Sequence, residues 1–168
     1  MSSAKPGKAS FSQPSIRIDV RWVLDGLLED ARITERDLNF VSGQRREKAE
    51  LNWNPLQFVA KFNLTDQHDD QHKLTLDKLT EWLGKRANQP VYNIDPLKVD
   101  VTATTSVMSF NFAERHEILA VAVDKESVTI ASGQAFLADW EHGLEQTLRG
   151  KKLKRGIITP AHLRRYML

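Results

Sequence analysis

Apolar residues in the first half of the chain recur with the period of an α-helix. Between residues 20 and 28 they follow the spacing i, i+3, i+4, i+7 and i+8, which places them on one helical face: Val20, Val23, Leu24, Leu27 and Leu28. Thr34 stands three positions before Asp37, the spacing of a capping box, so a second helix is expected from about Glu35.

Two more helix starts follow in this half. Asn54-Pro55 supplies an N-cap and a first-turn proline for a third helix. Thr75 caps a fourth helix, which should end before Pro90 because the residue before a proline avoids helical backbone angles. The segment between them, residues 65–73, is polar and is predicted to be a loop.

The second half changes to the period of β-structure. Residues 118–124 form a β-branched run, and residues 127–132 alternate apolar with polar positions after a short turn, so the two are expected to form a hairpin. A helix capped by Thr104 or Thr105 should precede them, and one over residues 136–148 should follow, with Trp140, Leu144 and Leu148 on its buried face. Residues 153–158 are predicted to form a third strand, and Thr159-Pro160 begins a last helix.

These elements predict an α+β fold in two parts. A flexible tail over residues 1–15 is expected to precede a helical subdomain over residues 16–89, and a small α/β subdomain should occupy residues 90–168. Its roughly three-stranded open sheet should pair the first two strands antiparallel and place the third strand parallel after a helical crossover. The last helix has no stop signal before Leu168, which indicates either a chain cut from a longer protein with a further domain downstream or a natural terminal helix that frays.

Composition removes several classes of protein. The 168 residues include no cysteine, which excludes a disulfide framework, a thiolate zinc site and a cysteine nucleophile. The net charge is only +2, which argues against nucleic-acid binding. No apolar run is long enough for a membrane helix and no secretory signal is present, so we expect a cytoplasmic protein without direct membrane insertion.

The sequence contains no motif of a catalytic site. It has no G-x-x-x-x-G-K-[ST] phosphate loop, no G-x-G-x-x-G and no G-x-S-x-G pattern. No close pair of carboxylates lies in an apolar context that would favour acid–base chemistry. We therefore expect no catalysis, no cofactor and no ATP binding by this chain.

One short segment holds residue types that bind metals. His68 and His72 would share a helical face, with Asp66, Asp69 and Asp70 close by in sequence. The segment lacks helix-forming apolar residues, and no glutamate stands between the histidines in the arrangement of a zinc protease. The prediction is a solvated loop and no metal.

A basic region near the end of the chain is the candidate docking surface. It consists of Lys151, Lys152, Lys154, Arg155, Arg164 and Arg165. These cations suit an acidic partner, a phosphate or a membrane surface. Alternatively they are the solvated charges of one strand edge and one helix face, where charge discourages unwanted strand pairing.

An ordered set of short segments between residues 54 and 168 carries a family resemblance. The segments are Asn54-Pro55-Leu56, Leu79-Thr80-Glu81-Trp82-Leu83, Pro90-Val91-Tyr92, Ile94-Asp95-Pro96, Phe112-Ala113-Glu114-Arg115-His116, Ile118-Leu119-Ala120-Val121, Val128-Thr129-Ile130-Ala131 and Arg155-Gly156-Ile157-Ile158. In this order they resemble the N-terminal domain of the type II secretion and type IV pilus assembly ATPases.

The resemblance implies a non-catalytic docking or regulatory domain. In that family such a domain precedes a hexameric ATPase and tethers it to an inner-membrane platform protein, so the protein would be peripheral to the inner membrane. The expected partners are that platform protein and the downstream ATPase domain, and the isolated domain is expected to be monomeric.

A cyclic dinucleotide sensor is the alternative that the resemblance suggests. Some members bind cyclic di-GMP through a motif that opens with Arg-Leu-Gly and closes with glutamine. This chain has Trp22-Val23-Leu24 at the opening, Ala31 in place of a glycine and Arg45 in place of the glutamine. Arg21, Arg45 or Arg46 would be the residues that contact such a ligand.

Overall fold

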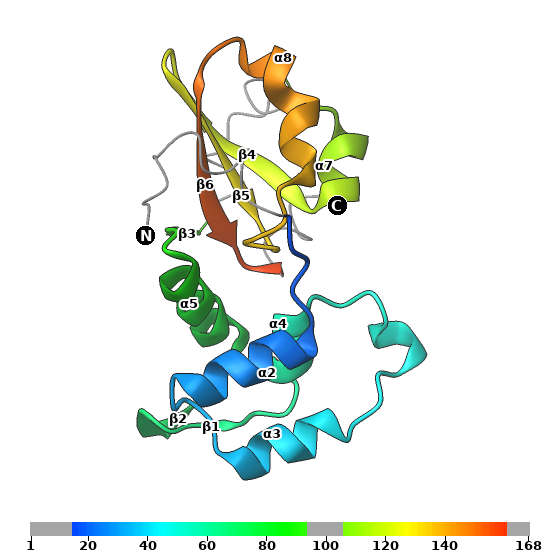
Figure 1. The fold of residues 1–168 in the computed structure, drawn as a ribbon, viewed down its shortest axis with the longest axis vertical. Coiled ribbons are helices and arrows are strands. Elements are labelled where there is room, and N and C mark those ends of the chain that lie inside the picture. Colours follow the sequence, from blue (N-terminus) through cyan, green and yellow to red (C-terminus); the bar gives the residue numbers. More distant parts are fainter. Residues whose placement is uncertain (1–14, 94–105, 161–168) are drawn as a thin grey trace. The chain divides into compact units, whose positions relative to one another are not determined.

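The computed structural model describes residues 15–93 and 106–160 (Figure 1). The chain divides into two compact units, Ile18–Leu83 and a second unit that joins Gly84–Leu168 to Met1–Arg17. The prediction that the parts meet at residues 89 and 90 therefore differs by a few residues from this division. Of the predicted tail, only Ser15 is described, and its hydroxyl accepts a hydrogen bond from the backbone N–H of Ala138 at 2.9 Å.

The first unit contains the predicted helices α2 (Val20–Glu29), α3 (Glu35–Ser42) and α4 (Pro55–Ala60), with a short 3₁₀ helix η1 (Lys48–Glu50). It also contains most of the fourth predicted helix, α5 (Leu76–Ala87), whose last residues from Gly84 belong to the second unit. The predicted caps form: Thr34 and Asp37 make a reciprocal capping box, and the Asn54 side chain accepts from the N–H of Leu56. The apolar faces of these helices are buried in the core of the unit. Six of their side chains are at most 1% exposed: Val23, Leu24, Leu27, Leu56, Leu79 and Leu83.

The polar segment predicted as a loop is instead a β-hairpin. Strands β1 (Thr65–Asp66) and β2 (Asp69–Lys73) pair antiparallel, with Thr65 opposite Lys73. Every residue of β2 is exposed, so burial does not explain its conformation. The loop prediction was wrong because tertiary contacts, chiefly at Asp66, outweigh the weak strand propensity of these residues.

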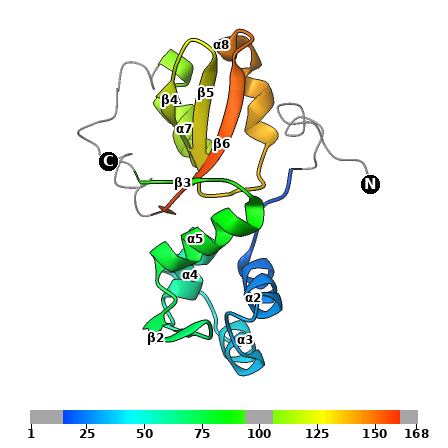
Figure 2. The ribbon, with the colours of Figure 1, turned by 90° about the vertical axis from the view of Figure 1, so that its left-hand side faces the viewer.

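The second unit is built on a four-stranded sheet with the order β3-β6-β5-β4. The strands are β3 (Val91–Tyr92), β4 (Ile118–Val123), β5 (Ser127–Ser132) and β6 (Lys152–Ile158). As predicted, β4 and β5 pair antiparallel and β6 runs parallel to β5. The sequence analysis missed β3, whose two residues pair parallel with Ile157 and Ile158 (Figure 2).

Helices cover one face of this sheet. They are α7 (Phe110–His116), the 3₁₀ helix η2 (Asp139–Leu144) and α8 (Glu145–Leu148), and their buried residues share a core with β4 and β5. Trp140, Leu144 and Leu148 pack in that core as predicted. The expected continuous helix is divided, however, and Gly143, a poor helix former, lies within η2, where an added Cβ would approach the Phe112 ring to 2.9 Å.

Glycine at position 156 allows β3 to join the end of β6. A Cβ there would overlap the ring of Tyr92 and lie 3.1 Å from the carbonyl oxygen of Pro90. The N–H of Ile157 donates to that same carbonyl at 2.8 Å. Gly156 therefore gives β3 the room to pair with the last two residues of β6.

The α+β class is confirmed. The predicted caps Thr104 and Thr105 lie outside the described residues. The expected helix is divided: residues 106 and 107 are helical, and after a break at Met108 and Ser109 the helix α7 begins with Ser109 as its N-cap. The last predicted helix lies outside the described residues after Pro160. Among the residues that are described, no helix has the length and apolar character to cross a membrane.

Candidate functional site

Strand β6 separates the basic residues that the sequence analysis grouped. Successive side chains of a strand point to opposite faces, so Lys152 and Lys154 lie on one face of the sheet and Leu153 and Arg155 on the other. Leu153 packs against the helix-covered core, which identifies the face that Arg155 shares. Lys152 and Lys154 are exposed.

Arg155 is a buried structural residue. Its side chain is 13% exposed, and its guanidinium lies 2.7 Å from the Oε2 atom of Glu141, which is 1% exposed. It also donates to the carbonyl oxygens of Ala135 and Leu137 and lies 4.7 Å from the ring centroid of Trp140. Burial lowers the pKa of Arg155, and the Glu141 carboxylate opposes that shift. These contacts leave Arg155 no role on an exposed docking surface.

The lysines of the candidate docking surface lie with two further cations at one end of the sheet. Strands β5 and β6 are parallel and Ser127 lies opposite Lys152, so the turn before β5 and the approach to β6 meet at one end. The N–H of Lys152 donates to the carbonyl of Glu126 at 2.8 Å and fixes this register. We call this surface the basic end of the sheet: Lys125, Arg149, Lys151, Lys152 and Lys154.

The acidic residue Asp124 at this end is engaged in hydrogen bonds with the backbone of the turn. Asp124 accepts hydrogen bonds from the N–H groups of Ser127 and Glu126 at 2.6 and 2.8 Å. These bonds, with a contribution from the positive charge of Lys154, lower the pKa of the Asp124 carboxyl. The carboxylate therefore shapes the turn and is also stabilised by the positive charge of Lys154.

The basic end also includes an unpaired stretch of strand. Of the described residues, β3 pairs only with Ile157 and Ile158, so the first part of β6 has no strand on the side away from β5. Lysines on such an edge discourage uncontrolled strand pairing. The two further candidates from the sequence, Arg164 and Arg165, lie outside the described residues.

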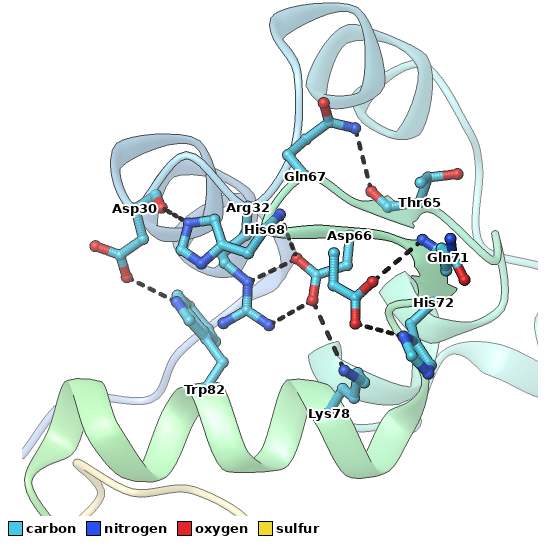
Figure 3. Close-up of polar contacts among 11 residues, drawn as sticks. Asp30, Arg32, Thr65, Asp66, Gln67, His68, Gln71, His72, Lys78 and Trp82 are labelled. Atoms are coloured by element: carbon cyan, nitrogen blue, oxygen red, sulfur yellow. Dashed lines mark hydrogen bonds and ion pairs between the residues drawn. The ribbon is translucent and has the colours of Figure 1, made fainter.

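A polar cluster in the first unit holds the β-hairpin (Figure 3). Arg32 donates from Nε and Nη2 to the two carboxylate oxygens of Asp66, both at 2.9 Å, and Lys78 of α5 approaches at 4.0 Å. Asp66 also accepts from the N–H of His68 at 3.0 Å. The bond from Arg32 leads the interactions that lower the pKa of Asp66 to about 2. The sequence offered no signal for this long-range pair.

The two histidines of the hairpin have separate partners. His68 Nε2 lies 2.9 Å from the carbonyl oxygen of Asp30, whereas His72 Nδ1 lies 2.5 Å from Oδ2 of Asp69. Within the described part of the chain, no three side chains of metal-ligating type are grouped so that they could hold an ion. The two histidines thus take part in separate contacts, one with Asp30 outside the hairpin and one with Asp69 inside it.

Comparison with known proteins gives the family. The sequence is 43% identical over 150 residues to the type IV pilus assembly ATPase TfpB of Acinetobacter baylyi (strain ATCC 33305 / BD413 / ADP1). The chain belongs to the type II secretion and type IV pilus assembly ATPases, as an N-terminal domain. This confirms the resemblance carried by residues 54–168. The match covers 89% of the chain but 26% of TfpB, so the chain spans about a quarter of that relative's length.

One solved structure shows the same fold as this N-terminal domain. Described as the structure of MshE with cdg, it superposes with a TM-score of 0.57 at 18% identity, over 86% of this chain and 95% of that one. A structure of the N-terminal domain of XpsE gives a TM-score of 0.42 at 13% identity, over 90% and 96% of the two chains. No family model matches the sequence.

The free energy of unfolding of this N-terminal domain should depend on the protonation state of Asp66. Its pKa of about 2 lies below the ordinary value of 3.8, so its ion pair stabilises the fold above pH 4 and the contribution is lost as the pH falls to 2. Asp66→Asn should cost about 2 kcal/mol near pH 7 and little near pH 2. Urea denaturation across this range measures the difference, and an NMR titration of Asp66 near 3.8 would contradict the account.

Removing Arg155 should damage the fold rather than a surface. Arg155→Ala leaves Glu141 buried without its cation, which should cost about 3–5 kcal/mol of unfolding free energy. Lys152→Ala, the control on the exposed face of the same strand, should change stability by less than about 0.5 kcal/mol. Chemical denaturation compares them, and equal stabilities would place Arg155 on the surface.

Proposed function

We propose that this chain is a non-catalytic docking domain that tethers a secretion or pilus-assembly ATPase to its inner-membrane platform, and that the basic end of the sheet contacts the platform protein. The family membership supports the setting, because the relative TfpB is named as a type IV pilus assembly ATPase. The observation that carries the surface assignment is the exposed pair Lys152 and Lys154 on a part of β6 without a neighbouring strand on its outer side among the described residues.

The chemistry of this surface selects an acidic partner. Two cations precede β6, two lie in it and one lies in the adjoining turn, so positive charge is gathered within one small area. Exposed cations at an interface chiefly raise the rate of association and make binding sensitive to salt. The proposal therefore predicts electrostatic steering more than a large gain in affinity at high ionic strength.

Charge reversal at Lys152 and Lys154 should weaken docking. The variant Lys152→Glu with Lys154→Glu replaces attraction with repulsion toward a carboxylate-rich partner, and the association rate at low salt should fall at least tenfold. Surface plasmon resonance with purified cytoplasmic domains of the platform proteins measures this rate at 50 and 500 mM salt. The difference from the parent chain should shrink at the higher concentration.

A matched variant separates a local effect from a change in overall charge. Lys85 of α5 and Arg115 of α7 are also exposed, and reversing both alters the net charge by the same amount. This control should bind like the parent chain. Equal binding by the Lys152/Lys154 variant, with a normal circular dichroism spectrum, would remove the basic end from the docking surface.

The alternative function, a cyclic dinucleotide sensor, receives less support from the contacts of the candidate arginines in the first unit. The related fold of MshE was solved with cdg, but two of the three candidate arginines here, Arg21 and Arg46, have internal contacts. Arg21 Nε lies 2.9 Å from Oδ1 of Asp25, and the guanidinium carbon of Arg46 lies 5.2 Å from the Phe58 ring centroid. Trp22 stands where the family motif has its opening arginine, and Arg45 stands where it has its closing glutamine, so neither motif side chain is present here.

Neither nucleotide is expected to bind the isolated chain. The sequence lacks a phosphate loop for ATP and departs from the cyclic di-GMP motif. Isothermal titration calorimetry with each nucleotide at 1 mM should show no saturable heat. Stoichiometric micromolar binding of ATP would contradict the non-catalytic assignment, and the same result with cyclic di-GMP would favour the sensor function.

A further inference from the structure

Two large apolar side chains protrude from the first unit. Phe40 of α3 is 55% exposed, and Leu51, which follows η1, is 59% exposed. The neighbouring residues Leu38 and Val41 supply the buried face of α3, so the helix does not need Phe40 for its packing. A phenylalanine in a solvent-facing helical position has no advantage in helix propensity, and burying its ring would be favourable.

The exposed Phe40 ring is connected to the core through two successive aromatic contacts. The Phe40 and Phe62 centroids lie 5.9 Å apart at an interplanar angle of 89°, and those of Phe62 and Phe58 lie 5.2 Å apart at 77°. Phe58 is 2% exposed and belongs to the core. Edge-to-face contacts of this kind hold a ring in one orientation, which reduces the entropy lost when a partner binds it.

Cations held by local contacts border the same rings. Arg46 lies 5.2 Å from the Phe58 centroid and donates from Nη1 to the carbonyl of Leu51 at 3.3 Å. Lys61 Nζ lies 5.4 and 5.5 Å from the centroids of Phe58 and Phe62. We call the five residues Phe40, Leu51, Phe62, Arg46 and Lys61 the Phe40 patch.

Charge around the Phe40 patch is unbalanced toward positive. The segment 45–61 carries the cations Arg45, Arg46, Lys48 and Lys61 and the carboxylates Glu47 and Glu50. Glu50 is buried against Lys61 at 2.5 Å, and that pair lowers the pKa of its carboxyl. A partner for this patch therefore needs an apolar side chain to cover Phe40 and carboxylates to meet Arg45, Arg46 and Lys48.

We propose that the Phe40 patch is a second protein-docking surface, which binds an acidic segment of a partner protein through a large apolar side chain flanked by carboxylates. Phenylalanine and arginine on a preorganised surface are typical of the centre of a protein interface. A lipid surface suits the patch less well, because Arg46 and Lys61 are drawn against phenyl rings and do not extend toward headgroups when Phe40 inserts. The inference does not depend on the basic end of the sheet.

Photo-crosslinking locates the partner segment. The full chain, made in its own cell with benzoylphenylalanine at position 40, should cross-link to one protein segment that carries at least two carboxylates within about four residues of a large apolar residue. Position 110 is the control, because Phe110 of α7 is 52% exposed and belongs to the second unit. Cross-links at position 40 that match those at position 110, or that join lipid, would overturn the proposal.

A synthetic peptide of the cross-linked segment then tests the chemistry. Fluorescence anisotropy should show that Phe40→Ala and Arg46→Glu each raise the peptide Kd at least tenfold, whereas Phe110→Ala changes it less than twofold. Vesicles of phosphatidylethanolamine with phosphatidylglycerol should not sediment the chain. Equal peptide affinity of Phe40→Ala and Phe110→Ala would overturn the inference, as would vesicle binding that Phe40→Ala abolishes.

The variants that test the two surfaces do not overlap. Lys152→Glu with Lys154→Glu should leave peptide binding at the Phe40 patch unchanged, and Phe40→Ala should leave the association rate at the basic end unchanged. Failure of one proposal is therefore distinguishable from failure of the other.

Discussion

The alternation of side chains along β6 is the constraint on which the second unit depends. One face of this strand contributes Leu153 to the core and Arg155 to a buried ion pair with Glu141, while the other presents Lys152 and Lys154. A shift of register by one residue would bury the lysines and expose Arg155, and both changes are costly. The register of β6 thus determines three features together: its parallel pairing with β5, the ion pair with buried Glu141 and the exposure of Lys152 and Lys154.

The sequence predicted the helical caps and the central hairpin well, because these depend on local interactions. Thr34 with Asp37 and Asn54 with Pro55 act within one turn. The alternation of apolar and polar residues in β5 is likewise a local strand signal, although all six residues of the strand are buried. The elements that the sequence analysis missed depend on tertiary contacts. The β1–β2 hairpin depends on Arg32, 34 residues away from Asp66, and β3 depends on space above Gly156.

The candidate site illustrates the same limit. Proximity in sequence grouped Arg155 with the lysines, although the pattern of Leu153, Arg155 and Ile157 at alternate positions already indicated an inward face. Glu141, which neutralises Arg155, comes from η2 and could not be assigned by spacing alone. The sequence analysis did not single out Phe40, because a helical pattern alone does not tell an exposed phenylalanine from a buried one.

Lysine footprinting of the complex tests the central claim most directly. The N-terminal domain described here is acetylated with a limiting amount of an amine-reactive reagent, alone and bound to the cytoplasmic domain of its platform protein. The modification of each lysine is then quantified by mass spectrometry. The account predicts that acetylation of Lys152 and Lys154 falls at least fivefold in the complex while that of Lys85 is unchanged. Unaltered acetylation of Lys152 and Lys154 in a complex shown to be intact would contradict it.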